Sequence, residues 1–186
     1  YQRGIYPSNS FQKTKYYGLQ MMVTIDKKLQ TYLNAILKQL ELWLLKGKVN
    51  KLVLIIASIA NQETLERWVF DIITDDNKIK NKLHGIKCKK EITKEIQGLI
   101  RQITSSVTFL PILDCECSFD ILMYTDKNDK IPLKWEITQD KFIKNEEYVQ
   151  LRSFDTKIHR VNPVVSYKIN DDSDCDDEMN DDIKQP

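Results

Sequence analysis

The chain has 186 residues, of which 30% are charged and 41% hydrophobic, and its formal net charge is +1. This length and composition fit one globular domain with a full core. No apolar run is long enough to span a membrane, and the first residues lack the apolar stretch of a signal peptide.

The charge is unevenly distributed along the chain. Residues 1–170 hold 27 basic and 19 acidic side chains, whereas residues 171–186 hold eight acidic side chains and one basic. We therefore expect a domain over residues 1–170 and a disordered acidic tail over residues 171–186. The lysines of the domain are scattered and form no basic stripe with interleaved aromatic residues, so a solvated surface is a better interpretation than nucleic-acid binding.

A helix is predicted after residue 26. Residues 19–25 form a short extended segment before it, and Asp26 is an N-cap residue. Lys46-Gly47-Lys48 ends the helix, because glycine accepts the left-handed conformation and cations suit the carboxyl end. The buried stripe has helical spacing and consists of Leu29, Leu33, Ile36, Leu40, Trp43 and Leu44.

Two strands are predicted next. Residues 51–57 are a continuous apolar run, and residues 66–73 alternate, with Trp68 and Phe70 on one face. The lysine-rich residues 75–88 then predict a mobile loop.

A second helix is predicted over residues 90–109, because Pro111 prevents it from continuing. A strand over residues 115–123 follows, and its alternation places Cys115 and Cys117 on one face. The buried stripe of the helix consists of Ile92, Ile96, Leu99, Ile103 and Val107.

The residues after Tyr124 lack a helical period but hold too many apolar side chains for a disordered segment. Residues 148–156 and 164–169 alternate like strands, with Asn162-Pro163 between them. Weak patterning leaves strand register poorly specified. The pattern alone favours a hairpin packed once on the sheet, and a segment with two placements is the alternative.

The sequence contains no enzyme motif. The five glycines form no phosphate-binding loop, and Glu146-Glu147 is no indication of a catalytic carboxylate pair. His84 and His159 lack the cysteine spacing of a zinc site. We expect a non-enzyme without cofactor or metal, with its four cysteines reduced as in cytosolic or nuclear proteins.

Four stretches carry a resemblance to a known family. They are residues 1–7 (Tyr-Gln-Arg-Gly-Ile-Tyr-Pro), 65–68 (Leu-Glu-Arg-Trp), 100–113 (Ile-Arg-Gln-Ile-Thr-Ser-Ser-Val-Thr-Phe-Leu-Pro-Ile-Leu) and 151–154 (Leu-Arg-Ser-Phe). The chain resembles HORMA-domain proteins, and within that family the spindle-checkpoint members. The resemblance implies an α+β fold, in which helices cover an antiparallel sheet and a mobile C-terminal safety belt spans roughly residues 127–170.

The resemblance also implies a function. The belt would trap a partner's peptide as an added strand. Implied partners are the coactivator of the anaphase-promoting complex, a coiled-coil kinetochore protein, a second copy in another conformation, and a remodelling ATPase with a HORMA-like adaptor. Capture of the coactivator would inhibit the ubiquitin ligase and delay anaphase, with the protein in the nucleus, at the kinetochore and in the cytoplasm. No membrane or direct nucleic-acid partner is expected.

Site residues are likewise implied by matching family positions. The implied dimer interface consists of Arg101, Gln102, Thr108, Phe109 and Arg152. The implied peptide and belt residues are Trp135, Leu151, Phe154, His159, Val165 and Tyr167.

Compared with the family, this sequence lacks a strand and a long helix before residue 1. We therefore expect Leu33 and Ile103 to be partly uncovered, and the chain to be less stable than a complete domain. The alternative interpretations are a HORMA paralogue that clamps a translesion-polymerase or meiotic-axis peptide, and a nonfunctional fragment.

Overall fold

The structure is a computed structural model that describes residues 1–75, 87–125, 132, 135–156 and 158–169. Most of the predicted loop over residues 75–88 lies outside the described residues. In chain order the elements are η1 (Ser8–Ser10), β1 (Phe11–Tyr16), β2 (Leu19–Thr24), α1 (Lys27–Leu45), β3 (Val49–Ser58), β4 (Thr64–Thr74), α3 (Lys89–Ser105), η2 (Ser106–Thr108), β5 (Cys117–Thr125), β6 (Glu146–Gln150), β7 (Phe154–Asp155) and β8 (His159–Lys168).

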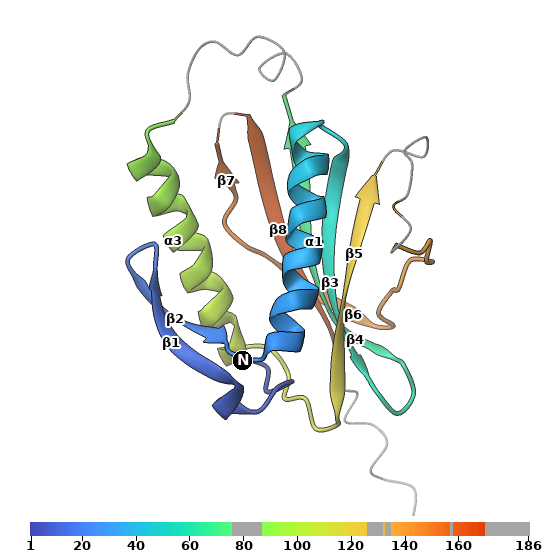
Figure 1. Cartoon of the computed structure of the whole chain (residues 1–186). Helices are drawn as coiled ribbons and strands as arrows, with labels where there is room; N and C mark the ends of the chain where they lie inside the picture. Colours follow the sequence, from blue (N-terminus) through green and yellow to red (C-terminus); the bar gives the residue numbers. More distant parts are fainter. Residues whose placement is uncertain (76–86, 126–131, 133–134, 157, 170–186) are drawn as a thin grey trace, which may run out of the picture.

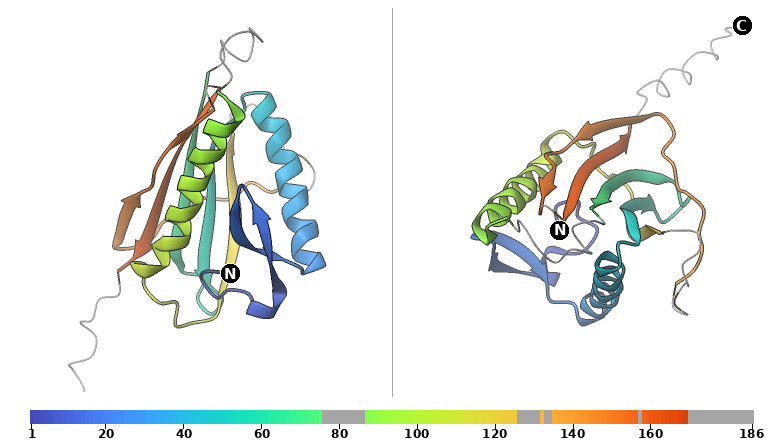
Figure 2. Two further views of the ribbon diagram at one scale, coloured as in Figure 1. Left: turned by 90° about the vertical axis from the view of Figure 1, so that its left-hand side faces the viewer. Right: turned by 90° about the horizontal axis from the view of Figure 1, so that it is seen from above.

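One antiparallel sheet organises the molecule. Its strands lie in the order β5-β3-β4-β8-β6, and the short β7 also pairs with β8. Helices α1 and α3 and the β1–β2 hairpin lie on one face of this sheet (Figures 1 and 2). Among the described residues, β5 and β6 are the outer strands, so the two sheet edges come from different parts of the chain.

Helix α1 forms as its end signals predict. The Asp26 side chain accepts the N–H groups of Lys28 and Leu29 at 2.8 and 2.9 Å, which satisfies two donors of the first turn. Gly47 has a φ of 65°, the left-handed conformation that ends a helix. Both predicted end signals are confirmed.

Helix α3 ends earlier than predicted. It stops at Ser105, and residues 106–108 form a 3-10 turn, so the prediction of a helix to residue 109 is wrong. The Ser106 hydroxyl donates to the Ile103 carbonyl at 2.7 Å, and the Thr108 hydroxyl donates to the Ser105 carbonyl at 2.8 Å. Hydroxyls that bond back to the chain compete with regular helix, and here they accompany a tighter last turn.

The β1–β2 hairpin was not fully predicted. Its extended second strand was expected over residues 19–25, but β1 was missed. Tyr17 and Gly18 have φ values of 49° and 75°, the two positive values of a tight two-residue hairpin turn. The Tyr-Gly pair between Phe11–Tyr16 and Leu19–Thr24 is the signal that was overlooked.

Strand β8 passes through Asn162 and Pro163 without a break, so the predicted interruption there is wrong. Pro163 lies opposite Phe70 of β4, and its carbonyl accepts the Leu151 N–H at 2.9 Å. The backbone of Pro163 faces residue 151, which lies between the end of β6 and the start of β7. On that side no described strand pairs with β8 at this point, so the N–H group that proline lacks is not needed for strand pairing. The C-terminal strand is therefore longer than its sequence pattern indicates.

Each face of the sheet carries its own apolar cluster. The helix-side cluster contains Trp68, Leu99, Leu110, Leu151 and Val165. The opposite cluster contains Val53, Ile55, Ala57 and Leu122, with Val69 and Tyr124 packed against it. Among the described residues, no helix is both long and apolar enough to cross a bilayer.

Candidate functional site

Strand β5 has an outer edge that is open to another strand. Among the described residues it pairs with β3 on one side and with no strand on the other. Residues of an antiparallel ladder point their backbone groups alternately to the two sides. The Glu116 carbonyl accepts the Ile59 N–H at 2.9 Å, so the backbone N–H and C=O groups of the even-numbered β5 residues point toward β3. The outward-facing backbone groups are those of Phe119, Ile121 and Met123.

Asp120 occupies this open edge. Its Oδ1 atom accepts the N–H of Ile121 at 2.8 Å. Its Oδ2 atom lies 3.8 Å from the Nζ atom of Lys141. One carboxylate therefore satisfies an outward N–H group and links β5 to a residue far along the chain. Charged side chains at a sheet edge also oppose indiscriminate strand pairing.

Residues 135–143, here named the crossing segment, run from α1 to the sheet. The Trp135 ring meets Trp43 of α1 edge to face, with centroids 5.3 Å apart. The Tyr124 hydroxyl donates to Asp140 Oδ1 at 2.5 Å. Burial raises the pKa of Tyr124, and the bond to Asp140 raises it further. The crossing segment is thus attached both to α1 and to β5.

The far end of the crossing segment lies on β4, on the face opposite the helices. The guanidinium carbon of Arg67 lies 5.2 Å from the centroid of the Phe142 ring, a cation–π contact. Ile143 beside it is buried. This end of the segment is therefore packed against the second face of the sheet.

The connection between β6 and β8 lies on α3. Gln102 Oε1 accepts the N–H of Arg152 at 2.6 Å, and Glu95 Oε2 accepts the N–H of Asp155 at 2.9 Å. Residues seven apart share one face of a helix, so the two acceptors lie in line along α3. The Nζ atom of Lys87 donates to Oε1, the other carboxylate oxygen of Glu95, at 2.5 Å. We name Glu95 and Gln102 the α3 latch.

Three of the predicted dimer-interface residues share the α3 surface. Arg101 and Arg152 are exposed, and Gln102 is joined to Arg152 through the α3 latch. A methyl group at Gly98 would lie 3.7 Å from Arg152 Nη1, so the arginine side chain lies across the helix at this glycine. The structure brings these three predicted residues together.

The other two predicted dimer-interface residues follow α3. Thr108 is exposed, and its hydroxyl donates back to Ser105. The Phe109 ring is 43% exposed, and its centroid lies 6.4 Å from that of Tyr167. Exposed aromatic rings and arginines are both enriched in protein-binding surfaces.

The predicted peptide and belt residues do not form one site. Trp135 lies in the crossing segment, whereas the other five lie in or beside the C-terminal hairpin. Leu151 and Val165 are buried in the helix-side core, and Phe154 packs against it. Tyr167 donates to Glu147 at 2.9 Å, and this bond, followed by burial, raises its pKa. His159 pairs with Thr74 of β4.

A buried ion pair joins two of the stretches that carried the family resemblance. Arg3 Nε donates to Glu66 Oε1 at 2.6 Å, and Arg3 also donates to the carbonyl of Pro111. Trp68 Nε1 donates to the second oxygen of Glu66 at 3.2 Å. Sequence reasoning missed this pair, because nothing in the local pattern links positions 3 and 66.

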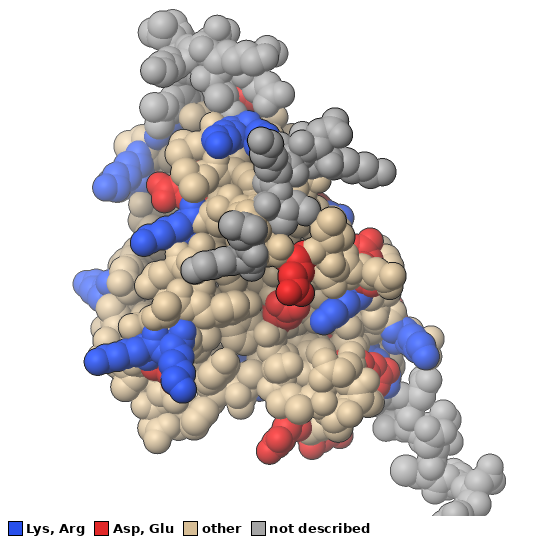
Figure 3. Space-filling model, turned by 45° about the vertical axis from the view of Figure 1, so that its right-hand side comes forward, with Lys and Arg blue, Asp and Glu red and all other residues tan. Residues whose placement is uncertain are grey.

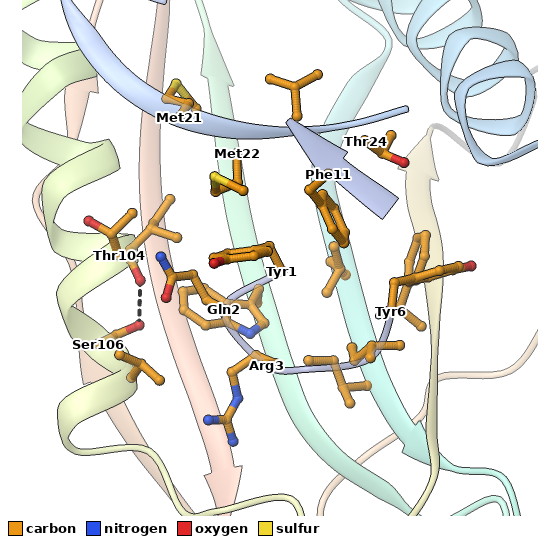
Figure 4. Close-up of a pocket in the computed structure, with 18 of the residues that line it drawn as sticks. Tyr1, Gln2, Arg3, Tyr6, Phe11, Met21, Met22, Thr24, Thr104 and Ser106 are labelled. Carbon is orange, nitrogen blue, oxygen red and sulfur yellow. Dashed lines mark hydrogen bonds between the residues drawn. The ribbon is translucent and has the colours of Figure 1, made fainter. Parts of the chain in front are cut away.

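An apolar cavity of about 610 Å³ lies on the helix side of the sheet (Figure 4). α1, α3 and the β1–β2 hairpin contribute to its walls, and β3 and β4 contribute to its floor. Leu33 and Ile103 line it, which confirms that both are partly uncovered in this chain. Tyr1, Arg3 and Tyr6 also border the cavity.

Comparison with known proteins identifies the family. The HORMA domain matches residues 1–159. The chain belongs to the HORMA-domain family. Mitotic spindle assembly checkpoint protein MAD2A of Dictyostelium discoideum is 52% identical over 172 residues, which cover 92% of this chain and 84% of that protein. MAD2A of Homo sapiens is 51% identical over 169 residues, covering 91% of this chain and 82% of that protein.

Solved structures agree with the HORMA fold. A chain in the crystal structure of a mitotic checkpoint complex has a TM-score of 0.81 and 40% sequence identity, covering 91% of this chain and 89% of that one. Caenorhabditis elegans HTP-2 bound to HTP-3 closure motif 1 has a TM-score of 0.69 and 13% identity, covering 90% of this chain and 79% of that one. At that identity the second likeness shows the fold alone. The predicted α+β HORMA fold is confirmed.

Proposed function

We propose that this HORMA protein is a spindle assembly checkpoint component that holds a partner peptide as an added strand on β5. The checkpoint role is supported by the names of its relatives, which are 40–52% identical. The peptide seat is supported chiefly by one observation: the outer edge of β5 is unpaired among the described strands, and the crossing segment is attached beside it.

The mechanism follows from the outward backbone groups of β5. A peptide strand would exchange hydrogen bonds with Phe119, Ile121 and Met123, which supplies affinity for any extended chain. Every second peptide side chain would face the helix side, and these positions would supply selectivity. Asp120 would have to release the Ile121 N–H before that bond forms.

The crossing segment makes release slow in this mechanism. The segment is attached at Trp43 on α1, at Tyr124 on β5 and at Arg67 on β4. A peptide enclosed between β5 and the segment leaves after some of these contacts break, so its dissociation is coupled to local unfolding.

The partners are proposed from the family resemblance. They are the coactivator of the anaphase-promoting complex, a coiled-coil kinetochore protein, a second copy of this chain, and a remodelling ATPase with a HORMA-like adaptor. Binding of the coactivator would inhibit the ubiquitin ligase and delay anaphase, by occupancy rather than catalysis. The proposed locations are the kinetochore, nucleus and cytoplasm.

We also propose that the domain ends after β8. The family match stops at residue 159, but β8 (His159–Lys168) lies between β4 and β6 in the same sheet. Removing it would uncover the buried Trp68 of β4, which lies opposite Val165 of β8. The predicted boundary at residue 170 is consistent with this strand, and the acidic tail over residues 171–186 lies outside the described residues.

Among the described residues, the face drawn in Figure 3 shows no continuous basic surface for nucleic-acid binding. On the face drawn in Figure 3, Lys and Arg side chains are scattered, and acidic side chains lie among them. A nucleic-acid interface needs a continuous basic surface that follows the phosphate backbone. Protein binding remains the function that the site supports best.

A backbone methylation scan tests the peptide seat. We would synthesise coactivator peptides from the same species, find one that binds, and methylate its backbone nitrogens one at a time. Strand addition predicts a period of two, because alternate N–H groups point toward β5. Methylation at those positions should abolish binding measured by calorimetry, and methylation at the positions between them should change it little.

Two outcomes would overturn parts of the proposal. Binding without the two-residue period would exclude an added strand. Absence of binding to coactivator peptides, with tight binding to a translesion-polymerase or meiotic-axis peptide, would keep the clamp and reject the checkpoint role. A Trp135→Ala variant provides a further check, because loss of the contact with Trp43 should speed dissociation.

A further inference from the structure

Two thiols lie together where β5 begins. The Sγ atoms of Cys115 and Cys117 are 3.8 Å apart, and Cys117 Sγ is 3.3 Å from the Cys115 carbonyl oxygen. Cys115 lies in a bend two residues before Cys117, the first residue of β5, and the chain there brings the two side chains together. Cys88 is exposed at the start of α3 and has no thiol neighbour among the described residues. The pair is absent from the function proposed above.

The two thiols differ in environment. Cys115 is exposed, whereas Cys117 is half-buried. Burial, followed by the hydrogen bond with Cys115, raises the pKa of Cys117 to about 11. Since the thiolate is the reactive form and access limits attack, Cys115 is the thiol that meets an oxidant first. Cys117 then lies beside it, which is the arrangement of a reactive and a resolving cysteine.

We propose that Cys115 and Cys117 form a reversible redox pair that low-molecular-weight disulfides oxidise. The Cys115 thiolate attacks one sulfur of the small disulfide, forms a mixed disulfide and releases one small thiolate. Cys117 loses its proton to solvent and attacks the Cys115 sulfur, which releases the second small thiol. Two protein thiols and one small disulfide thus become one protein disulfide and two small thiols.

Closing the bond requires a modest movement with a local consequence. A disulfide is about 2.05 Å long, so the two sulfur atoms must approach by less than ~2 Å. Glu116 lies between the cysteines, and its carbonyl accepts the Ile59 N–H at 2.9 Å. Drawing residues 115 and 117 together strains this bond, because Cys117 is held opposite Ser58. Oxidation should therefore loosen the first pairs of the β3–β5 ladder.

The test uses the full chain with Cys175→Ser, so that the tail thiol does not interfere. The protein is treated with excess oxidised glutathione and digested, and each cysteine peptide is weighed. We expect the peptide with Cys115 and Cys117 to lose two hydrogens, and Cys88 to carry glutathione. In Cys117→Ser, Cys115 should retain the glutathione adduct. Dithiothreitol should reverse every product.

Two matched measurements keep the proposal falsifiable. Cys88→Ser should leave the internal disulfide unchanged, and amide exchange at Ile59 should quicken on oxidation of the unsubstituted pair. A glutathione adduct that persists on Cys115 when Cys117 is present would overturn the proposal. Disulfide-linked dimers through Cys115 would overturn it as well.

Discussion

At the scale of single residues, Asp120 is placed to protect the open edge of β5. It accepts the Ile121 N–H, and it pairs with Lys141 of the crossing segment. A strand that added to β5 would compete for the same N–H. The carboxylate therefore blocks one hydrogen-bonding position of the edge, and it favours partners that are able to displace it.

Asp120→Ala tests this role. Loss of the acceptor should speed amide exchange at Ile121 by about tenfold, the effect of a hydrogen bond worth about 1.4 kcal/mol. Global stability should change by less than about 1 kcal/mol, because the ion pair with Lys141 is exposed. Nuclear magnetic resonance exchange measurements would read both.

Asp71→Ala is the matched control for the Asp120 prediction. Asp71 is a half-buried acid on the inner strand β4 and pairs with Lys51 at 3.5 Å. Its loss should leave Ile121 exchange as it was. If Asp120→Ala also left Ile121 exchange unchanged, protection of the β5 edge by Asp120 would be excluded.

Residues with a local role were predictable from the sequence. Asp26 and Gly47 act within a few positions of themselves, so their residue types were sufficient. Arg3 and Glu66 are 63 positions apart, and their pairing depends on how the sheet packs against the N-terminal residues. No property of either residue type indicates the other, so the buried pair was missed.

At the scale of elements, the α3 latch makes the C-terminal connection sensitive to acid. The hydrogen bond from Lys87, and then the Asp155 N–H, lower the pKa of Glu95. A carboxyl group with a lowered folded pKa stabilises the fold above its unfolded pKa of about 4.3. That contribution is lost as the pH falls through the lowered folded pKa.

Glu95→Gln isolates the charge, because glutamine keeps an oxygen that accepts the Asp155 N–H. In the unsubstituted chain, the exchange rate of the Asp155 N–H, divided by its intrinsic rate at the same pH, should rise as the pH falls below the pKa of a carboxyl group. In Glu95→Gln this rise in the rate ratio should vanish. Glu91→Gln, on the exposed first turn of the same helix, should behave like the unsubstituted chain. An equal pH response in all three proteins would contradict the latch.

The elements that were predicted correctly have strong internal periodicity. α1, β3, β4 and the body of α3 carry their own apolar patterns, and all were found close to the expected positions. Two predictions failed for different reasons. β8 tolerates Pro163 because the gap between β6 and β7 lies beside it. The turn that follows α3 is a 3-10 turn, in which the Ser106 hydroxyl bonds to a carbonyl of the helix itself.

At the scale of the whole molecule, the order of the strands in the sheet could not be predicted from the local sequence pattern. β8 inserts between β4 and β6, although residues 75–158 separate it from β4 in sequence. The apolar pattern of β8 is equally compatible with pairing at either sheet edge. The family resemblance, rather than periodicity, supplied the expectation of a C-terminal segment with more than one possible place.

The cavity between the two helices is also a property of the whole molecule, and it predicts dye binding. Its lining is mainly apolar and comes from α1, α3, the β1–β2 hairpin and the sheet. Exposed apolar surface binds anilinonaphthalene sulfonate, whose fluorescence then rises. Leu33→Gln and Val107→Gln place an amide in the lining and should each lower that fluorescence several-fold. Leu37→Gln is the control, because Leu37 lies on α1, is 57% exposed and is absent from the lining. Circular dichroism would establish that each variant is folded, and equal fluorescence in all of them would show that the dye binds elsewhere.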